Sequence, residues 1–565
     1  MTLSFLEVVR HNLFLDMLII VLSFGINYAV RRQVEYACLA VIPTFILLIV
    51  DKLLPEQFQL IEQDFYALVA LSIVLGIIQN IIFYIFFNNR NKRAYRLSWW
   101  INVIFLAYVT LQVEKYTANT VVNSVIASIT LLMGIVVQHF CFFQATLVRI
   151  RKGLAPIKAK KLALSIYYFF IFGCGCLVLT IYIFFLRWNR KLSLSDKRLY
   201  VNKLISKLLG KLYTDISYIE MSVSYAQNLN TQRPTILVAN HNSFLDTFVV
   251  SGLSGQVIFM VNQWVYNTPF FGKVIKYVGY IPTTSSYEDN EIQIRQRFEE
   301  GFQLLVFPEG TRSKTNKLNR FHKGAFALAQ SLQADIVPLF IHGHAELLPK
   351  SDFVIDYNYK TNITIGERIL YESFKDTPVS TLTKQISSSF RSNFQKLRTQ
   401  YEDAHYFDEK LKDSYNYWSK RLQQYIAWDL QYRAEIFYLI LDWIQSDKSI
   451  ALAVDDWGLW SYYFKMRNAT QKVIAILPDE NQQFIANDNY LNQRYPIEIV
   501  GTDKEISTVI DTYIVDVQQI TELSTNYRQI ILLNYDGVQL PHYQLVHQTP
   551  YFKIFRKLDE AIPGI

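Results

Sequence analysis

The sequence predicts a mixed fold in three parts: a helical transmembrane region at residues 1–186, an α/β domain at 187–384, and a helical linker with a doubly wound α/β domain at 385–565. Three observations predict these parts. Apolar residues crowd the first 190 positions of a 565-residue chain that is 51% hydrophobic. Strand-like apolar runs near residues 235 and 304 each precede a polar motif. After residue 410, strand-like and helical runs alternate.

The first region contains several apolar segments that are long enough to cross a bilayer. The candidate spans are 13–30, 37–50, 66–87, 97–113, 120–145 and 164–186. Arg31-Arg32 and the basic run from Arg90 to Arg96 should face the cytoplasm, and the acid-bearing loop 51–65 should face outward. The chain is therefore expected to be a multi-pass protein of the inner (cell) membrane.

The sixth segment sets the side on which the rest of the chain lies. A full span at 164–186 would place the following domain outside the cytoplasm. Both flanks of this segment are basic, and Gly173-Cys-Gly175 lies at its centre. Between a span and a re-entrant hairpin that returns to the same face, we favour the hairpin, which keeps the next domain on the cytoplasmic face.

Positive charge is concentrated beside this segment. Between Arg149 and Lys211 there are fourteen Lys and Arg residues against one acid, Asp196. Basic residues that flank an apolar segment indicate a membrane surface and not nucleic acid. The four cysteines all lie in apolar stretches, which argues against a disulfide framework and a cysteine zinc site.

Residues 187–234 are expected to form a basic, amphipathic lead-in. Apolar residues recur at helical spacing, with lysines on another side, which suits a helix lying on a membrane interface. The apolar residues are Leu204, Leu208, Leu209, Leu212 and Ile216, and the lysines are Lys203, Lys207 and Lys211.

Two motifs carry the chemistry of the next domain. The run Thr235–Asn240 leads into His241 and, five residues later, Asp246. A neutral imidazole can take the proton of a hydroxyl that attacks a thioester, and a carboxylate on the other ring nitrogen fixes the tautomer. The second run leads into Pro308–Ser313, where Gly310 could offer a backbone N–H to an oxyanion and Arg312 could hold a phosphate.

Together these motifs resemble the glycerolipid (lysophosphatidate-type) acyltransferase superfamily over roughly residues 200–375. Phe321-His-Lys-Gly324 and Ile336–Phe340 are further matches. The resemblance implies an acyl-CoA or acyl carrier protein donor, no metal and no required cofactor. It implies His241 and Asp246 as catalytic residues. It assigns substrate binding to Glu309, Gly310, Thr311, Arg312 and Lys323.

One stretch departs from the pattern of this superfamily. Its second block usually carries an Arg that helps to bind the acceptor phosphate, but Gly279–Ser285 has none. Four nearby cations could substitute: Lys273, Lys276, Arg295 and Arg297. Otherwise the acceptor is not a phosphate monoester.

The membrane region resembles the terminal half of MMPL/RND-type permeases. Leu75–Phe83 lies where that family often has a Gly-rich span with an Asp, and Asn119–Val125 opens a following span. No Asp or Glu lies inside these later spans, although a proton-driven pump would need one. This part is interpreted as a vestigial permease half or one that depends on a partner permease subunit.

The last domain resembles a class I methyltransferase. Its expected strands are Ile450–Val454, Lys472–Ile476, Ile497–Val500, Thr512–Val515 and Gln529–Leu533. At the end of the first strand, Asp455 and Gly458 are candidates for S-adenosylmethionine binding, with Asp479 or Glu480 after the second. Gly458 alone remains of the glycine-rich turn, so a degenerate structural or partner-binding domain is favoured.

The order of these three parts resembles large fused proteins of bacterial aryl-polyene and flexirubin-type pathways. The leading hypothesis is therefore an integral membrane O-acyltransferase that acts on a lysophospholipid or on a specialised lipid or pigment acceptor. The rival is a transport or assembly subunit whose acyltransferase-like domain binds lipid without turnover.

Overall fold

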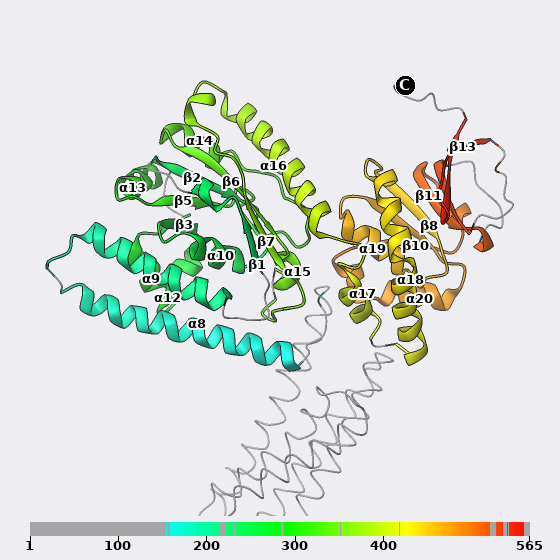
Figure 1. The fold of residues 1–565 in the computed structure, drawn as a ribbon, viewed down its shortest axis with the longest axis horizontal. Coiled ribbons are helices and arrows are strands. Elements are labelled where there is room, and N and C mark those ends of the chain that lie inside the picture. Colours follow the sequence, from blue (N-terminus) through cyan, green and yellow to red (C-terminus); the bar gives the residue numbers. More distant parts are fainter. Residues whose placement is uncertain are drawn as a thin grey trace, which may run out of the picture. The chain divides into compact units, whose positions relative to one another are not determined.

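The computed structural model describes most of the chain after residue 153 (Figure 1). The described residues are 154, 159–188, 190–214, 221–229, 233–283, 287–350, 352–416, 418–519, 527–534, 540 and 542–558. The five predicted spans before residue 146 and both permease-like stretches lie outside the described residues.

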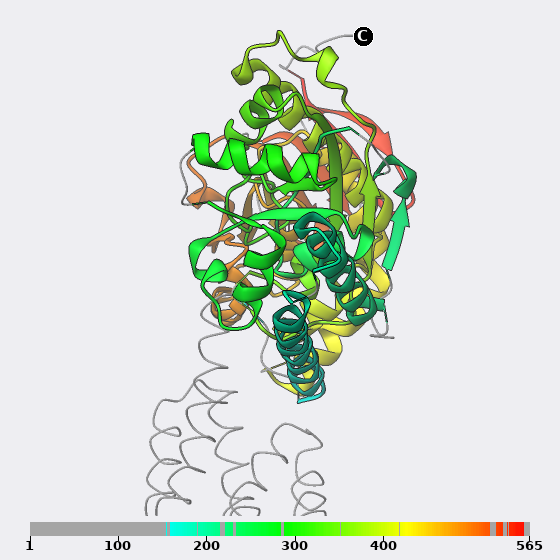
Figure 2. The same cartoon turned by 90° about the vertical axis from the view of Figure 1, so that its left-hand side faces the viewer.

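The described part begins with two helices, α8 (Ala159–Leu186) and α9 (Leu194–Thr214), which lie side by side (Figures 1 and 2). Helix α8 is unbroken, so the expected re-entrant hairpin is wrong. Gly175 permits close packing instead of a turn, since a Cβ at this position would lie 2.5 Å from Leu208 of α9. By length and composition, Leu164–Leu186 is the one candidate membrane span among the described residues.

Helix α9 confirms the predicted helical spacing, but its apolar side faces protein. Val201, Ile205 and Leu209 are buried, and Gly210 allows a close crossing with Gly252 of the helix α10 (Leu245–Leu253). The three predicted lysines, Lys203, Lys207 and Lys211, are exposed. The apolar stripe of this helix therefore belongs to the core of the α/β domain and is not open to a membrane.

The first domain is built on a seven-stranded sheet in the order β1-β7-β6-β2-β5-β3-β4. The strands are β1 (Met221–Ser224), β2 (Thr235–Ala239), β3 (Val257–Val261), β4 (Ile281–Pro282), β5 (Gln303–Val306), β6 (Asp335–His342) and β7 (Thr361–Ile365). Strand β2 pairs in parallel with both β5 and β6, and β6 and β7 are antiparallel. Every residue of β2 and β5 is buried, as expected for parallel strands covered on both faces.

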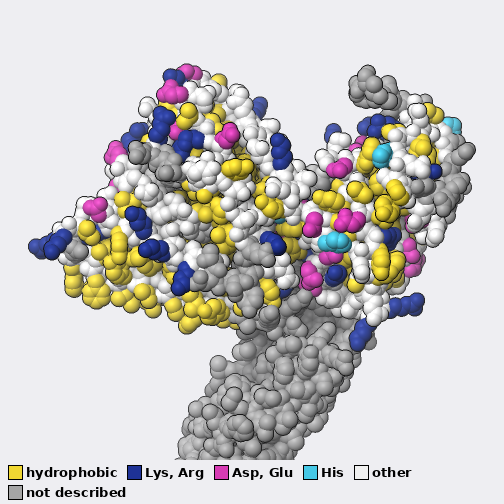
Figure 3. All heavy atoms as spheres, in the orientation of Figure 1, with side chains coloured by type: hydrophobic (Ala, Val, Ile, Leu, Met, Phe, Trp, Pro, Cys, Tyr) yellow, Lys and Arg dark blue, Asp and Glu magenta, His cyan; other side chains and the backbone are white. Residues whose placement is uncertain are grey.

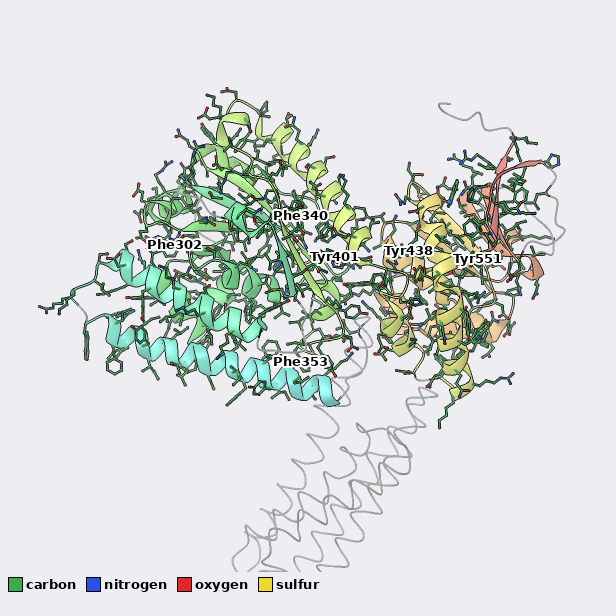
Figure 4. All side chains as sticks on the ribbon, viewed as in Figure 1. Phe302, Phe340, Phe353, Tyr401, Tyr438 and Tyr551 are labelled. Carbon is green, nitrogen blue, oxygen red and sulfur yellow. The ribbon has the colours of Figure 1, made fainter. Side chains whose placement is uncertain are left out.

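The strands of this domain are joined by helices. These are α10, α11 (Gln263–Tyr266), α12 (Phe271–Val278), α13 (Tyr287–Glu299), α14 (Gly324–Ser331), α15 (His344–Leu347) and α16 (Val379–Tyr401). Helix α16 spans the predicted boundary at residue 384. Its residue Phe390 packs on Phe340 of β6 with ring centroids 4.5 Å apart, so this helix belongs to the core of the first sheet. Figure 4 labels Phe340 on β6 and Tyr401 at the end of this helix.

The second sheet confirms the predicted doubly wound fold. Its order is β10-β9-β8-β11-β12-β14-β13. The strands are β8 (Ser449–Ala453), β9 (Lys472–Ile476), β10 (Glu498–Val500), β11 (Ile510–Asp516), β12 (Tyr527–Leu533), β13 (Tyr543–Gln548) and β14 (Phe552–Lys557). The first five are parallel and coincide with the five predicted strands, whereas the antiparallel pair β13 and β14 was not predicted.

The helices of this region are α17 (Asp408–Ser414), α18 (Lys420–Ile444), α19 (Leu459–Arg467) and α20 (Glu480–Asp488). Helix α19 is buried along its whole length, and its Trp460 stacks on Phe437 of α18 with ring centroids 4.1 Å apart. This stacking makes α18 and α19 part of one buried core.

Candidate active site

His241 lies directly after β2, in a loop that the protein fixes from two sides. The preceding Asn240 donates to the carbonyl of Ile341 and accepts from its N–H, at 2.8 Å each, which ties the loop to β6. The imidazole stacks on Phe307 with ring centroids 3.9 Å apart. The ring is therefore held in place before any substrate arrives.

Asp246 lies in the first turn of α10 and is fully buried. Its Oδ2 accepts from the His241 ring Nδ1 at 2.8 Å and from the backbone N–H groups of Asn242 and Ser243 at 2.8 Å each. Burial by itself raises the pKa of Asp246, but the bonds from His241 and His344 outweigh it and hold that pKa well below its usual range. Since Nδ1 is engaged, Nε2 is the nitrogen of His241 that remains for a substrate hydroxyl.

A second histidine supports the same carboxylate. His344, at the start of α15, donates from Nδ1 to Asp246 Oδ1 at 2.6 Å. Its Nε2 lies 2.6 Å from the Tyr213 hydroxyl, which in turn lies 2.7 Å from Thr361 Oγ1. In a neutral His344 imidazole with Nδ1 protonated, Nε2 accepts the Tyr213 proton, so this tautomer satisfies the chain of bonds.

Sequence reasoning missed His344 and Tyr213. The available signal was the position of His344 just beyond the apolar run of β6. Parallel neighbours β2 and β6 end at the same edge of the sheet, so polar residues after either strand meet there. Tyr213 gave no such signal, because it lies on a helix remote in sequence.

Glu309 joins the two motif loops. Its Oε1 accepts from the His241 N–H at 2.8 Å and its Oε2 from the Asn319 N–H at 2.7 Å. Burial raises the pKa of Glu309 to about 7, although these two backbone bonds favour the ionised form. The side chain is 2% exposed, so Glu309 positions the loops and has little surface to offer a substrate.

Gly310 forms part of the tight turn after β5. Its φ of +68° is in the left-handed region, which favours glycine, and its N–H donates to the Phe307 carbonyl at 3.1 Å. The binding of an oxyanion by this N–H stays a prediction. Within the described residues, the N–H groups of Thr311 and Arg312 have no protein acceptor.

A cavity of about 200 Å³ opens beside His241. Its polar lining includes His241, Thr311, Arg312 and Lys350. The rest of the lining is mostly apolar and includes Leu209, Phe244, Phe248, Met260, Val265 and Phe271. A polar end that carries the base and an apolar remainder suit a lipid-like substrate.

The other predicted substrate-binding cations do not line this cavity. Lys323 is exposed at the start of α14. Lys276 lies over the Tyr266 ring, Arg295 pairs with Glu291, and Arg297 pairs with Glu300. Lys273, also outside the cavity lining, is exposed on α12. Lys350, which was not predicted, is the lysine in the lining.

The predicted cofactor residues of the second sheet share one edge. Asp455 and Gly458 follow β8, and Asp479 follows the neighbouring parallel strand β9. Asp455 accepts from Gln482, and Asp479 caps α20 by accepting from the Asn481 N–H at 3.1 Å. The structure thus brings the three residues to the same edge of the sheet, where Asp455 and Asp479 already bond to protein groups.

The turn after β8 is closed by a residue that was not predicted to matter. Asp456 is buried and accepts from the N–H groups of Gly458 at 2.9 Å and Trp460 at 2.6 Å. Burial raises its pKa to about 7. A carboxylate of the chain therefore occupies the N-terminus of α19, where a bound anion would otherwise be favoured.

No group of histidine, cysteine, aspartate or glutamate residues in the described part of the chain has an arrangement that could hold a metal ion.

Comparison with known proteins locates the family signal in the first sheet domain. A family model described as Acyltransferase matches residues 220–342. The chloroplastic 1-acyl-sn-glycerol-3-phosphate acyltransferase of Arabidopsis thaliana is 28% identical over 149 residues, 25% of this chain and 42% of that protein. The 1-acyl-sn-glycerol-3-phosphate acyltransferase of Pseudomonas aeruginosa is 24% identical over 24% of this chain and 54% of that protein. The enzyme of the same name from Saccharomyces cerevisiae is 32% identical over 23% of this chain and 45% of that protein.

The matched part of the chain spans about half the length of these curated relatives. The crystal structure of the 1-acyl-sn-glycerophosphate acyltransferase from Thermotoga maritima aligns with a TM-score of 0.38 and 23% identity, over 43% of this chain and 97% of that one. The sequence matches show that the chain carries an acyltransferase domain related to glycerolipid acyltransferases.

Proposed function

From this acyltransferase domain, we propose that the chain is a membrane-bound O-acyltransferase. It moves an acyl group from acyl-CoA or acyl carrier protein to a hydroxyl of a lysophospholipid or of a specialised lipid or pigment acceptor. One observation carries the proposal: His241 lines a largely apolar cavity, and its Nδ1 is bound at 2.8 Å by a buried carboxylate. This pairing supports general-base catalysis by Nε2.

The proposed reaction needs no covalent enzyme intermediate, because the thioester is already activated. The acceptor oxygen attacks the thioester carbonyl carbon while its proton passes to Nε2 of His241. Asp246 stabilises the imidazolium, and the unpaired N–H groups of Thr311 and Arg312 are the candidate donors to the oxyanion. When the C–S bond breaks, the imidazolium returns the proton to the departing thiolate.

Membrane attachment is proposed from the outer side of α8. Large apolar side chains recur along it and are exposed, among them Phe170 (64%), Val178 (63%) and Phe185 (59%). Figure 3 shows this apolar strip along α8, with basic side chains at one end. Ring contacts from Phe172 to Phe244 and Phe248 connect the helix to the cavity wall, so an acceptor in the membrane would lie close to the site.

Multi-pass insertion with the catalytic domain on the cytoplasmic face stays a prediction, as do the permease-like interpretation and the fused-pathway architecture. For the second sheet we propose a structural or partner-binding role. The support is Asp456, which fills the turn where S-adenosylmethionine would have to approach.

The test is acyl transfer by the purified full chain in nanodiscs. Labelled acyl-CoA and acyl carrier protein are offered with lysophosphatidate, other lysophospholipids and a total lipid extract. We expect labelled lipid that accumulates with time and enzyme concentration, and its mass identifies the acceptor. Lipid binding without any labelled product from any acceptor would refute the proposal and favour the transport or assembly role.

A further inference from the structure

Two cations stand at the polar end of the cavity, and they come from different parts of the chain. Arg312 follows β5, and Lys350 follows α15 beyond β6. The Lys350 ammonium donates to the Thr311 hydroxyl at 2.9 Å and to the Arg312 carbonyl at 2.8 Å. Two of its three donors are therefore used to hold it against the Arg312 loop, and one remains for a ligand.

The positive charge at this end is not neutralised by the protein. Among the described residues, neither Arg312 nor Lys350 forms an ion pair with a carboxylate. The negative charge of Asp246 attracts Arg312 electrostatically, but both oxygens of this carboxylate are already bound by histidines. Burial first, and then repulsion by Arg312 and Lys314, lowers the pKa of Lys350.

Such a pair is costly in a partly buried site unless an anion joins it. A phosphate group offers the acceptor oxygens that a guanidinium fork and an ammonium bind together. The four cations that sequence reasoning offered in place of the missing arginine all lie outside the cavity lining.

We propose that Lys350 is a specificity-determining residue that, with Arg312, binds the phosphate of the acceptor while the acceptor hydroxyl lies at His241. The inference rests on the proposed acyl-transfer function, and it adds the residue by which the site separates phosphate-bearing acceptors from neutral ones. Lys350 takes the place of a cation that the segment 279–285 lacks.

The experiment compares Lys350→Met and Lys350→Arg with the wild type in the full chain, and uses Lys276→Met as the matched control. Steady-state rates are measured with lysophosphatidate and with monoacylglycerol, which has the hydroxyl but no phosphate. Lys350→Met should raise KM for lysophosphatidate about tenfold or more, as expected for one lost charge-assisted contact, with kcat little changed. Lys350→Arg should keep most of the affinity, and Lys276→Met should match the wild type.

A second arm identifies which phosphate is bound, since acyl-CoA also carries phosphates. KM for acyl-CoA and for acyl-N-acetylcysteamine, a thioester without phosphate, should be unchanged in Lys350→Met. A rise in KM for acyl-CoA alone, or an equal loss with both acceptors, would overturn the proposal. Unchanged melting temperatures exclude a folding defect, and a variant that melts early is replaced by Lys350→Gln.

A binding measurement separates this proposal from the proposed function. Equilibrium binding of lysophosphatidate and monoacylglycerol to nanodisc-embedded protein is measured without an acyl donor. If the wild type transfers no acyl group but Lys350→Met still weakens lysophosphatidate binding about tenfold, the anion site stands and the acyl-transfer function fails. If the wild type binds both lipids equally, the inference on Lys350 is wrong.

Discussion

The segments that follow β2 and β8 have a similar local structure, but their buried aspartates have different roles. Each is a buried parallel strand that runs into a short loop and a helix, and each has a buried aspartate near the start of that helix. After β2, Asp246 bonds to a histidine whose ring lines a cavity. After β8, Asp456 bonds to the N–H groups of its own helix.

The role of a carboxylate at a strand end depends on the groups that donate hydrogen bonds to it. Both aspartates accept backbone N–H bonds, but Asp246 also accepts from two imidazoles, which hold its pKa below the usual range. Asp456 has no such partner, and burial raises its pKa to about 7. Asp246 is therefore held as an anion beside the base His241, and Asp456 caps the N-terminus of α19.

The matched pair Asp246→Asn and Asp456→Asn tests this contrast with the largest expected effect. Asp246→Asn should lower kcat of acyl transfer by roughly two orders of magnitude or more, because the amide no longer fixes the His241 tautomer. Asp456→Asn should leave kcat within about twofold of the wild type, as a change outside the cavity lining. Rates of both variants in the full chain provide the check, and similar losses in the two would contradict the contrast.

His344→Gln tests whether the second histidine positions Asp246. We expect kcat to fall about tenfold with KM nearly unchanged, as for a lost hydrogen bond of a buried charged group. The pH–rate profile should shift in this variant, because Asp246 loses one of the two imidazole bonds that hold its pKa below the usual range. Thr361→Val changes the far end of the same chain of hydrogen bonds and is the control. Its kcat should fall less than that of His344→Gln. An unshifted profile would assign His344 a structural role only.

The pH dependence of stability should distinguish the two turns. The folded pKa of Asp456, about 7, lies above its unfolded value, so the folded state holds a proton that the unfolded chain releases. Stability of this turn should therefore fall as pH rises from about 4 to about 7 and then level off. Hydrogen exchange at α19, at pH 5 and pH 8, measures this fall. Asp456→Asn should abolish it, and a persistent fall would implicate Asp429, whose pKa burial also raises.

We expect the chain not to bind S-adenosylmethionine, which is the smallest of these expected effects. Because Asp456 fills the N-terminus of α19, calorimetric titration of the full chain should give no binding heat, and α19 should not change its hydrogen exchange. Saturable binding would show that Asp455 and Gly458 form a working site despite the closed turn.

The parts of the fold that the sequence predicted are those set by local pattern. Strands β2, β5, β8, β9, β11 and β12 are largely apolar runs because both faces of a parallel sheet are buried. The pairing of His241 with Asp246 follows from a spacing that one strand, one loop and one helix turn fix. These features depend on residues close in sequence.

The rest depended on contacts between distant segments. Gly175 suggested a hairpin, but Leu208 fills the space beside it and the helix continues. Tyr213 and His344, 131 positions apart, meet only when α9 packs beside α15. Lys350 reaches the cavity through bonds to Thr311 and Arg312, and no local spacing indicates them.

The most direct test of the account is the rate of acyl transfer by His241→Ala beside Asp455→Ala, each in the full chain with the acceptor that the wild type uses. We expect His241→Ala to lose roughly two or more orders of magnitude in kcat, as general-base catalysis requires, and Asp455→Ala to keep the wild-type rate. A His241→Ala variant that folds normally and transfers acyl groups at the wild-type rate would contradict the account.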